Sequence, residues 1–218
     1  MKRVFILLFC CSILTGCGTP AVKIDQLGNI PLKDKEGIIV GAMVVERTKI
    51  NSDGTITPDS LATVHGEALL FVVPTENNGI GNTVVFENKG HELQFFRTAS
   101  DKYYLRNFVS MQFLVGPGEF ATVKGKCDVY PGKITYIGTL KLKIVTHDEK
   151  EFMNRETIAT LEAINDIETA RAEIDRKFPE MKNDVVIQLP ELTKASAPVY
   201  PSVPFYTLRE MKELQRTK

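Results

Sequence analysis

The amino-acid sequence predicts a mainly β protein: an antiparallel two-sheet sandwich of about seven strands, with one amphipathic helix packed on it near the C-terminus. Two observations carry this prediction. Segments within residues 36–146 repeatedly alternate apolar and polar side chains, which is the two-residue period of a half-buried strand. Glycine, proline and asparagine turns separate these segments, and antiparallel strands joined by such turns favour a sandwich.

The first four predicted strands include two that are apolar almost throughout. Residues 37–45 and 67–73 have the nearly continuous apolar character of central strands that are covered on both faces. Asp53-Gly54 marks a turn between them. Residues 83–86 and 92–98 complete the first half of the strand set.

The last three predicted strands, 103–115, 119–130 and 133–145, form a meander with short turns at Gly116-Pro117-Gly118 and Pro131-Gly132. In the first of them the apolar residues take the odd positions, and only Asn107 breaks the pattern. In the third, one face is expected to hold five apolar residues, with Ile137 as the exception: Ile134, Tyr136, Leu140, Leu142 and Ile144.

Cys127 shares the inward face of its strand with Val123 and Val129. We therefore expect it to be a small buried hydrophobic residue and not a nucleophile or an intermolecular link.

The one convincing helix is expected at 166–178. Four apolar residues follow each other at spacings of three and four, and they form one stripe: Ile167, Ala170, Ile174 and Phe178. Asn165 can cap the N-terminus and Pro179 ends the helix. The stripe is expected to cover an open face of a sheet, and docking of a partner on this helix is the alternative.

The N-terminus has the layout of a secretory signal peptide. Lys2 and Arg3 precede an apolar run, 4–14, and small residues follow in the segment Leu14-Thr15-Gly16-Cys17. The run is about half of the ~20 residues that a membrane-spanning helix needs. A cleaved segment is therefore favoured over a transmembrane anchor.

The segment Leu14-Thr15-Gly16-Cys17 resembles the lipobox of bacterial lipoproteins. The resemblance implies that Cys17 becomes the first residue of the mature chain and carries acyl chains that anchor it in a lipid bilayer. Gly18, in place of aspartate, implies the periplasmic face of the outer membrane over the inner membrane. The expected location is therefore the bacterial cell envelope.

Four parts of the chain follow from these signals. Residues 1–16 are the signal peptide, 17–35 a tether after the lipidated cysteine, 36–193 the sandwich domain, and 194–218 a proline-rich arm with a short terminal helix. Removing residues 1–16 leaves 25 of the 27 basic residues against 27 acidic ones, so nucleic acid is not an expected partner.

The arm carries apolar residues that need a surface to pack on. Prolines at 198, 201 and 204 favour a polyproline II stretch, which covers few of its own apolar groups. We expect the arm to dock on its own domain or on an envelope protein partner, through five contact residues: Tyr200, Phe205, Tyr206, Leu208 and Met211.

No motif in the chain signals catalysis. His65, His91 and His147 lack metal-ligand spacing, and no nucleophile elbow or phosphate-binding loop is present. No cofactor, metal or catalytic residue is therefore expected. The favoured function is a non-enzymatic binding or assembly module, and a hydrolase-like envelope enzyme with a site assembled in space stays open as the alternative.

The run from Phe113 to Phe120, followed by Val129 to Leu140, resembles a loose group of bacterial lipoproteins. Their pattern is a strand, a Pro-Gly turn, a strand and a Gly-(Lys/Glu)-x-x-Tyr-(Ile/Leu)-Gly segment. The resemblance implies a prealbumin-like β-sandwich with a helix near the C-terminus. Its motifs are turns and core positions, so it implies a fold and transfers no catalytic residue.

Overall fold

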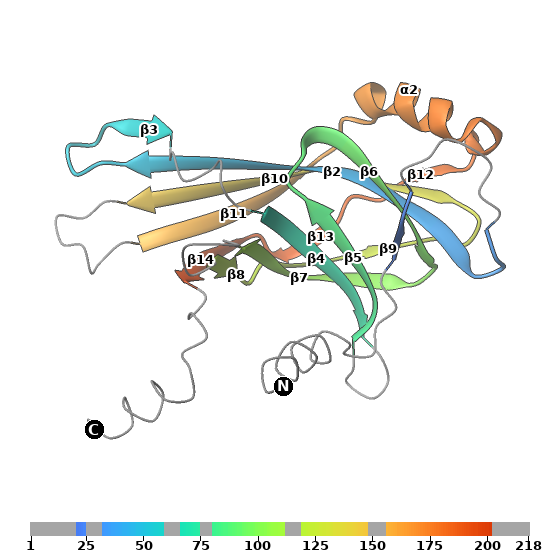
Figure 1. Cartoon of the computed structure of the whole chain (residues 1–218), viewed down its shortest axis with the longest axis horizontal. Helices are drawn as coiled ribbons and strands as arrows, with labels where there is room; N and C mark the ends of the chain where they lie inside the picture. The colour runs from blue at the N-terminus through green and yellow to red at the C-terminus, as the bar shows by residue number, and fades with distance from the viewer. Residues whose placement is uncertain are drawn as a thin grey trace, which may run out of the picture.

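The computed structural model describes residues 21–24, 32–58, 66–74, 80–111, 119–147 and 156–201. These residues form fourteen strands, one α-helix and one 3₁₀ helix (Figure 1). The first seven strands are β1 (Val22–Lys23), β2 (Glu36–Ile50), β3 (Ile56–Pro58), β4 (Gly66–Pro74), β5 (Ile80–Glu87), β6 (Gly90–Ala99) and β7 (Lys102–Met111). The rest are β8 (Glu119–Ala121), β9 (Lys124–Asp128), β10 (Ile134–His147), β11 (Glu156–Ile164), α2 (Ile167–Lys177), η2 (Pro179–Met181), β12 (Val185–Ile187), β13 (Glu191–Lys194) and β14 (Ser196–Pro201).

The strands form two sheets that meet at β14. One sheet has the order β1-β6-β2-β10-β11, with β3 on β2 and β12 on β10. The other contains β5-β4-β7, and β7 pairs with both β8 and β9. Residues 196–198 of β14 pair with β11 and residues 199–201 pair with β8, so one short strand links the sheets.

The prediction of a mainly β chain with two sheets and a helix is confirmed, but the strand number and directions differ from those expected. Fourteen strands replace seven, and β10 runs parallel to both β2 and β12. The Pro131-Gly132 turn does not close a hairpin, because β9 pairs with β7 and β13 while β10 enters the other sheet. The continuous apolar character of β2 fits this parallel pairing, since parallel strands are usually buried on both faces.

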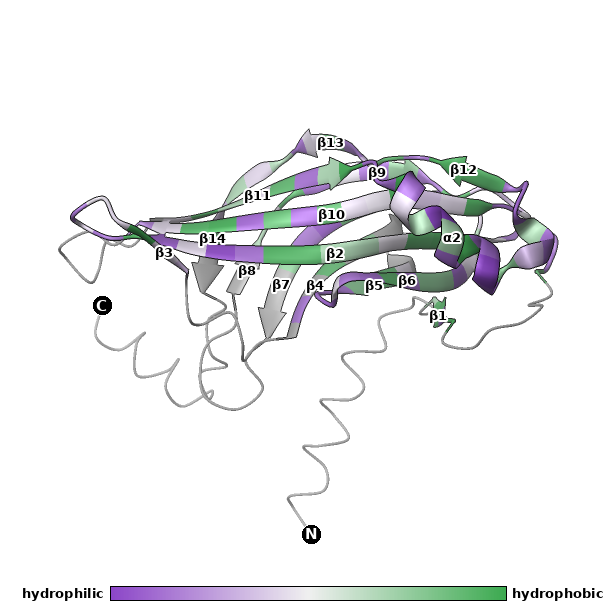
Figure 2. Cartoon of the chain, turned by 90° about the horizontal axis from the view of Figure 1, so that it is seen from above, coloured by the Kyte–Doolittle hydropathy of each residue, from purple (hydrophilic) through white to green (hydrophobic). Residues whose placement is uncertain are grey.

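The apolar residues of β2 divide between two cores. Ile39 and Met43 belong to the larger core, which draws residues from both sheets, including Phe71, Phe86 and Leu140. Ile38, Val40 and Ala42 point the other way, into a smaller core beneath α2. Figure 2 shows the hydrophobic residues of β2 concentrated in the half near α2. The expectation that this strand is covered on both faces is confirmed.

Helix α2 begins and ends within one residue of the predicted range. Ala170, Ile174 and Phe178 are buried in the smaller core, where the Phe178 ring lies 5.6 Å from the ring of Phe95. The N-cap position is Asp166, and the Asn165 side chain accepts a hydrogen bond from the backbone N–H of Ile167 at 3.4 Å. The Asp166 carboxylate accepts hydrogen bonds from the hydroxyl groups of Tyr136 and Thr139. The stripe therefore covers the outer face of β2, β6 and β10, as predicted.

A bulge in β10 corrects the predicted strand phase. The register with β2 shifts between Tyr136 and Thr139, and Gly138 adopts a φ of 84°, a conformation that favours glycine. Tyr136 consequently belongs to the core beneath α2, whereas Ile137 and Leu140 belong to the larger core. The single face predicted for Ile134 through Ile144 is wrong, and the bulge accounts for the position of Ile137.

Two segments predicted to lie outside the domain contribute to its sheets. In the segment expected to be a tether, Val22 and Lys23 pair with β6, and Ile24 is buried. In the segment expected to be an arm, residues 196–201 form β14 and not a polyproline II stretch. No helix among the described residues is long and apolar enough to cross a membrane.

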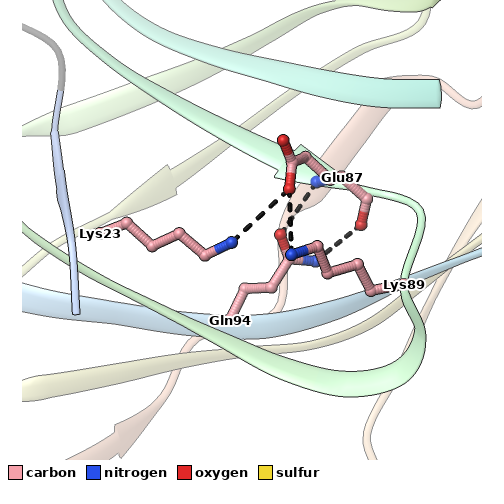
Figure 3. A network of polar contacts seen from close by, with 4 residues as sticks. All are labelled: Lys23, Glu87, Lys89 and Gln94. Atoms are coloured by element: carbon pink, nitrogen blue, oxygen red, sulfur yellow. Dashed lines mark hydrogen bonds and ion pairs between the residues drawn. The ribbon is translucent and has the colours of Figure 1, made fainter. Parts of the chain in front are cut away.

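The N-terminal strand is held by polar contacts as well as by pairing. The backbone N–H of Ala21 donates to the carbonyl oxygen of Thr83 in β5 at 2.9 Å, while β1 pairs with β6 on its other side. Figure 3 shows the Glu87 carboxylate beside the ammonium groups of Lys23 and Lys89, at 3.5 and 3.4 Å. The chain entering the domain is thus held between β6 of one sheet and β5 of the other.

Candidate functional site

An interruption in β7 opens a groove in the surface of the second sheet. β7 pairs with β9 through Leu105 and with β8 from Phe108 onward, so Arg106 and Asn107 lie between the two pairings. On its other edge, the register with β4 skips Arg106. β7 therefore contains a bulge, a feature that often lies beside functional sites.

The groove at this bulge has a volume of about 540 Å³ and is open to solvent. Basic, aromatic, amide and hydroxyl residues line it, and more than half of the lining surface is apolar: Tyr104, Leu105, Arg106, Asn107, Thr122, Lys124, Gly125 and Thr193. β7, β9, β13 and the segment after β8 supply these residues. Segments nearly ninety residues apart in the chain thus meet at one site.

The basic residues of the groove differ from a neighbouring lysine outside it in whether they form an ion pair with a carboxylate. Lys126, the next outward residue of β9, forms an ion pair with Glu191 at 2.9 Å, and this hydrogen bond raises the pKa of Lys126. Arg106 and Lys124 are exposed, and neither forms an ion pair with any residue in the described part of the chain. Lys194 lies directly opposite Lys124 in the β9–β13 pair. The groove therefore has an excess of positive charge.

Close strand packing fixes the base of the groove. A Cβ atom on Gly125 would lie 3.0 Å from a methyl carbon of Leu192 and 3.1 Å from the carbonyl oxygen of Glu191. The absence of a side chain at Gly125 thus allows β13 to approach β9. Beneath the surface, Leu105 and Val123 are buried in the larger core. The polar side chains consequently project from strands that the core holds in place.

The groove can bind an anion through donors of several kinds. Arg106 offers a planar fork of N–H groups, Lys124 an ammonium group, and Asn107, Thr122 and Thr193 an amide and two hydroxyl groups. Tyr104, with 38 % of its surface exposed, adds an aromatic ring at the wall. This combination suits recognition of a negatively charged group attached to an apolar moiety.

Most of the site residues predicted from sequence lie outside the described residues. These are Cys17, Phe205, Tyr206, Leu208 and Met211. Tyr200 lies in β14, where its backbone is paired with Phe120 of β8. Docking of the arm on its own domain is thus observed for residues 196–201, and the roles assigned to the other arm residues stay predictions.

The described histidines do not come together at a site. His91 is exposed near the start of β6, and His147 is the last residue of β10. In the part of the chain that the structure covers, no three His, Cys, Asp or Glu side chains are placed to hold a metal ion.

Cys127 occupies the position predicted for it. Only 2 % of its surface is exposed, and burial raises the pKa of its thiol to about 12. Its neighbours in the larger core include Val123 and Val129. The prediction that Cys127 is a buried hydrophobic residue is confirmed.

The sequence alone did not identify Arg106 or Lys124 as site residues. One signal was visible: Asn107 interrupts the apolar alternation of its strand. The structure shows that this interruption marks the bulge, because Phe108 follows Leu105 into the core at an uneven spacing. The contribution of β13 had no local signal, since it depends on long-range strand pairing.

Comparison of the chain with protein-family models, with curated proteins and with solved structures finds no match.

Proposed function

We propose that this protein is a lipid-anchored lipoprotein of the bacterial cell envelope that binds a ligand without chemical conversion, with the groove at the β7 bulge as its binding site. The observation that carries the proposal is the groove itself. Its cations, Arg106 and Lys124, face solvent on a rigid base and have no carboxylate partner among the described residues. Charged groups that a fold leaves without internal partners are available to a ligand.

The anchor in this proposal is Cys17. Its support is the sequence of the signal peptide and of the segment Leu14-Thr15-Gly16-Cys17. Gly18 supports the periplasmic face of the outer membrane as the destination. The β-sandwich of the lipoproteins that the chain resembles is part of the same proposal, and its support is the larger core, to which both sheets contribute.

The anchor is tested by metabolic labelling with palmitate followed by membrane fractionation. The wild-type chain is expected to incorporate label and to stay with membranes in high salt. Cys17→Ser is expected to lose the label and to leave uncleaved or soluble protein, whereas Cys127→Ser is the matched control that keeps the label. Equal labelling of the wild-type chain and Cys17→Ser contradicts the anchor.

The groove is tested by placing a photo-crosslinking amino acid at Asn107 in intact cells. A crosslinker at Arg176, an exposed residue of α2, is the control. Irradiation is expected to give an adduct of defined mass at position 107 and none at position 176. An absence of position-specific adducts contradicts the groove as the binding site while leaving the anchor unaffected.

A further inference from the structure

The pairing of β9 with β13 places a second lysine opposite one of the lysines of the groove. Lys124 and Lys194 occupy directly opposite positions in the antiparallel β9–β13 pair, an arrangement in which like charges repel. The backbone pairing of Leu192 with Gly125 and of Glu191 with Lys126 holds these two strands together. Arg106 adds a third positive charge, and the one acidic residue of β13, Glu191, is already bound to Lys126. An anion in the groove would relieve this repulsion.

The number and charge of these donors suit a phosphate group. A phosphate monoester carries a charge of about −1.5 to −2 at pH 7 and has three strong acceptor oxygens. The Arg106 guanidinium can bind two of these oxygens at once, and the Lys124 ammonium adds a point charge. A carboxylate offers one charge and two oxygens, so it would leave more of the three cations unneutralised.

Tyr104 indicates what the phosphate is attached to. Tyr104 lines the groove, and 38 % of its surface is exposed. An exposed aromatic ring contributes apolar contact area, which a bare phosphate ion cannot use.

We infer that the groove binds a phosphate monoester whose organic part contacts Tyr104, with Arg106 and Lys124 binding the phosphate oxygens. This inference rests on the proposed binding function of the groove and adds its ligand class. A soluble phosphate monoester and the headgroup of phosphatidic acid share this chemistry.

The inference is tested by calorimetric titration of the full chain, purified in neutral detergent, with phenyl phosphate and with inorganic phosphate. Saturable binding of phenyl phosphate is expected, with affinity that falls as salt concentration rises. The double variant Arg106→Gln/Lys124→Gln is expected to bind at least about tenfold more weakly. Arg176→Gln/Lys182→Gln removes the same charge elsewhere and is expected to change affinity less than about twofold, since screening weakens distant charges.

Tyr104→Leu distinguishes the contribution of the organic part of the ligand to affinity from that of its phosphate group. It is expected to weaken phenyl phosphate binding several-fold and to leave inorganic phosphate binding unchanged. Titration in micelles doped with phosphatidic acid, whose headgroup is a phosphate monoester, then distinguishes the two sources. If the doped lipid competes with phenyl phosphate for the wild-type chain and this competition is lost in the groove double variant, the ligand is a lipid headgroup. If phenyl phosphate binding persists in the doped micelles, the ligand is a soluble ester.

Two results would overturn the inference. One is no saturable binding of phenyl phosphate to the folded wild-type chain. The other is an equal loss of affinity in the groove and the control double variants. If a crosslinked adduct still forms at position 107, only the ligand class is wrong; if none forms, the proposed binding function fails as well.

Discussion

The face covered by α2 and the face that carries the groove use polar residues in opposite ways. At the start of α2, Asp166 accepts hydrogen bonds from Tyr136 and Thr139, and just before β10 the Lys133 ammonium lies 2.5 Å from the Asp184 carboxylate. At the groove, Arg106 and Lys124 have no such partners within the described residues. Polar groups that satisfy one another stabilise a fold, whereas groups left open to solvent at a recess are available for recognition.

The first prediction concerns stability, which this comparison assigns to the helix-covered face. Phe178→Ala removes a fully buried ring from the core beneath α2 and is expected to lower the free energy of unfolding by about 3–5 kcal/mol. Tyr104→Ala, at the groove, is expected to cost less than about 1 kcal/mol because its ring is partly exposed. Urea denaturation measures both values, and similar losses would contradict the division between the two faces.

The second prediction concerns pH and Cys127. The pKa of its thiol is about 12 in the folded chain against a reference value of 9.0, so the unfolded chain loses this proton first. The stabilising contribution of the thiol is therefore complete below pH 9 and declines by up to about 1.4 kcal/mol per pH unit as pH rises toward 12.

Cys127→Ala is the variant that isolates this effect. It is expected to cost about 1 kcal/mol at pH 7, through the small cavity that it leaves. Between pH 9 and pH 10 its stability should fall less steeply than that of the wild-type chain. Rapid modification of native Cys127 by a bulky maleimide would contradict the burial on which the prediction depends.

The third prediction has the smallest expected effect and concerns Lys124. Lys124→Gln removes the repulsion with Lys194 across the β9–β13 pair, so stability is expected to be unchanged or to rise by up to about 0.5 kcal/mol. Lys126→Gln is the matched control, because it breaks the ion pair with Glu191 and leaves that carboxylate without its partner. Thermal unfolding at low ionic strength compares the two, and a larger loss for Lys124→Gln would show that this lysine stabilises the fold.

Features that depend on local periodicity could be predicted from the sequence. The helix stripe that ends at Phe178, the burial of β2 on both faces and the inward position of Cys127 all follow from spacing along one segment. Each needs only the period of its own element, which side-chain burial enforces.

Features that depend on a single extra residue or on distant pairing could not be predicted. The bulges at Gly138 and Arg106 reverse the inward face part-way along a strand, so an average over the strand hides them. The parallel pairing of β2 with β10 joins residues about a hundred positions apart, for which local turns give no signal. The groove depends on features of both kinds.

The short chain length between the proposed anchor and β1 sets the reach of the molecule. Only residues 18–20 separate Cys17 from Ala21, whose backbone N–H donates a hydrogen bond to β5. Even fully extended, this link spans about 14 Å, less than half the thickness of a bilayer's hydrocarbon core. With its lipid anchor at Cys17, the folded domain would lie against the lipid headgroups and would have little freedom to move away from them. Anything that it captures would be captured at the membrane surface and presented there in a restricted orientation.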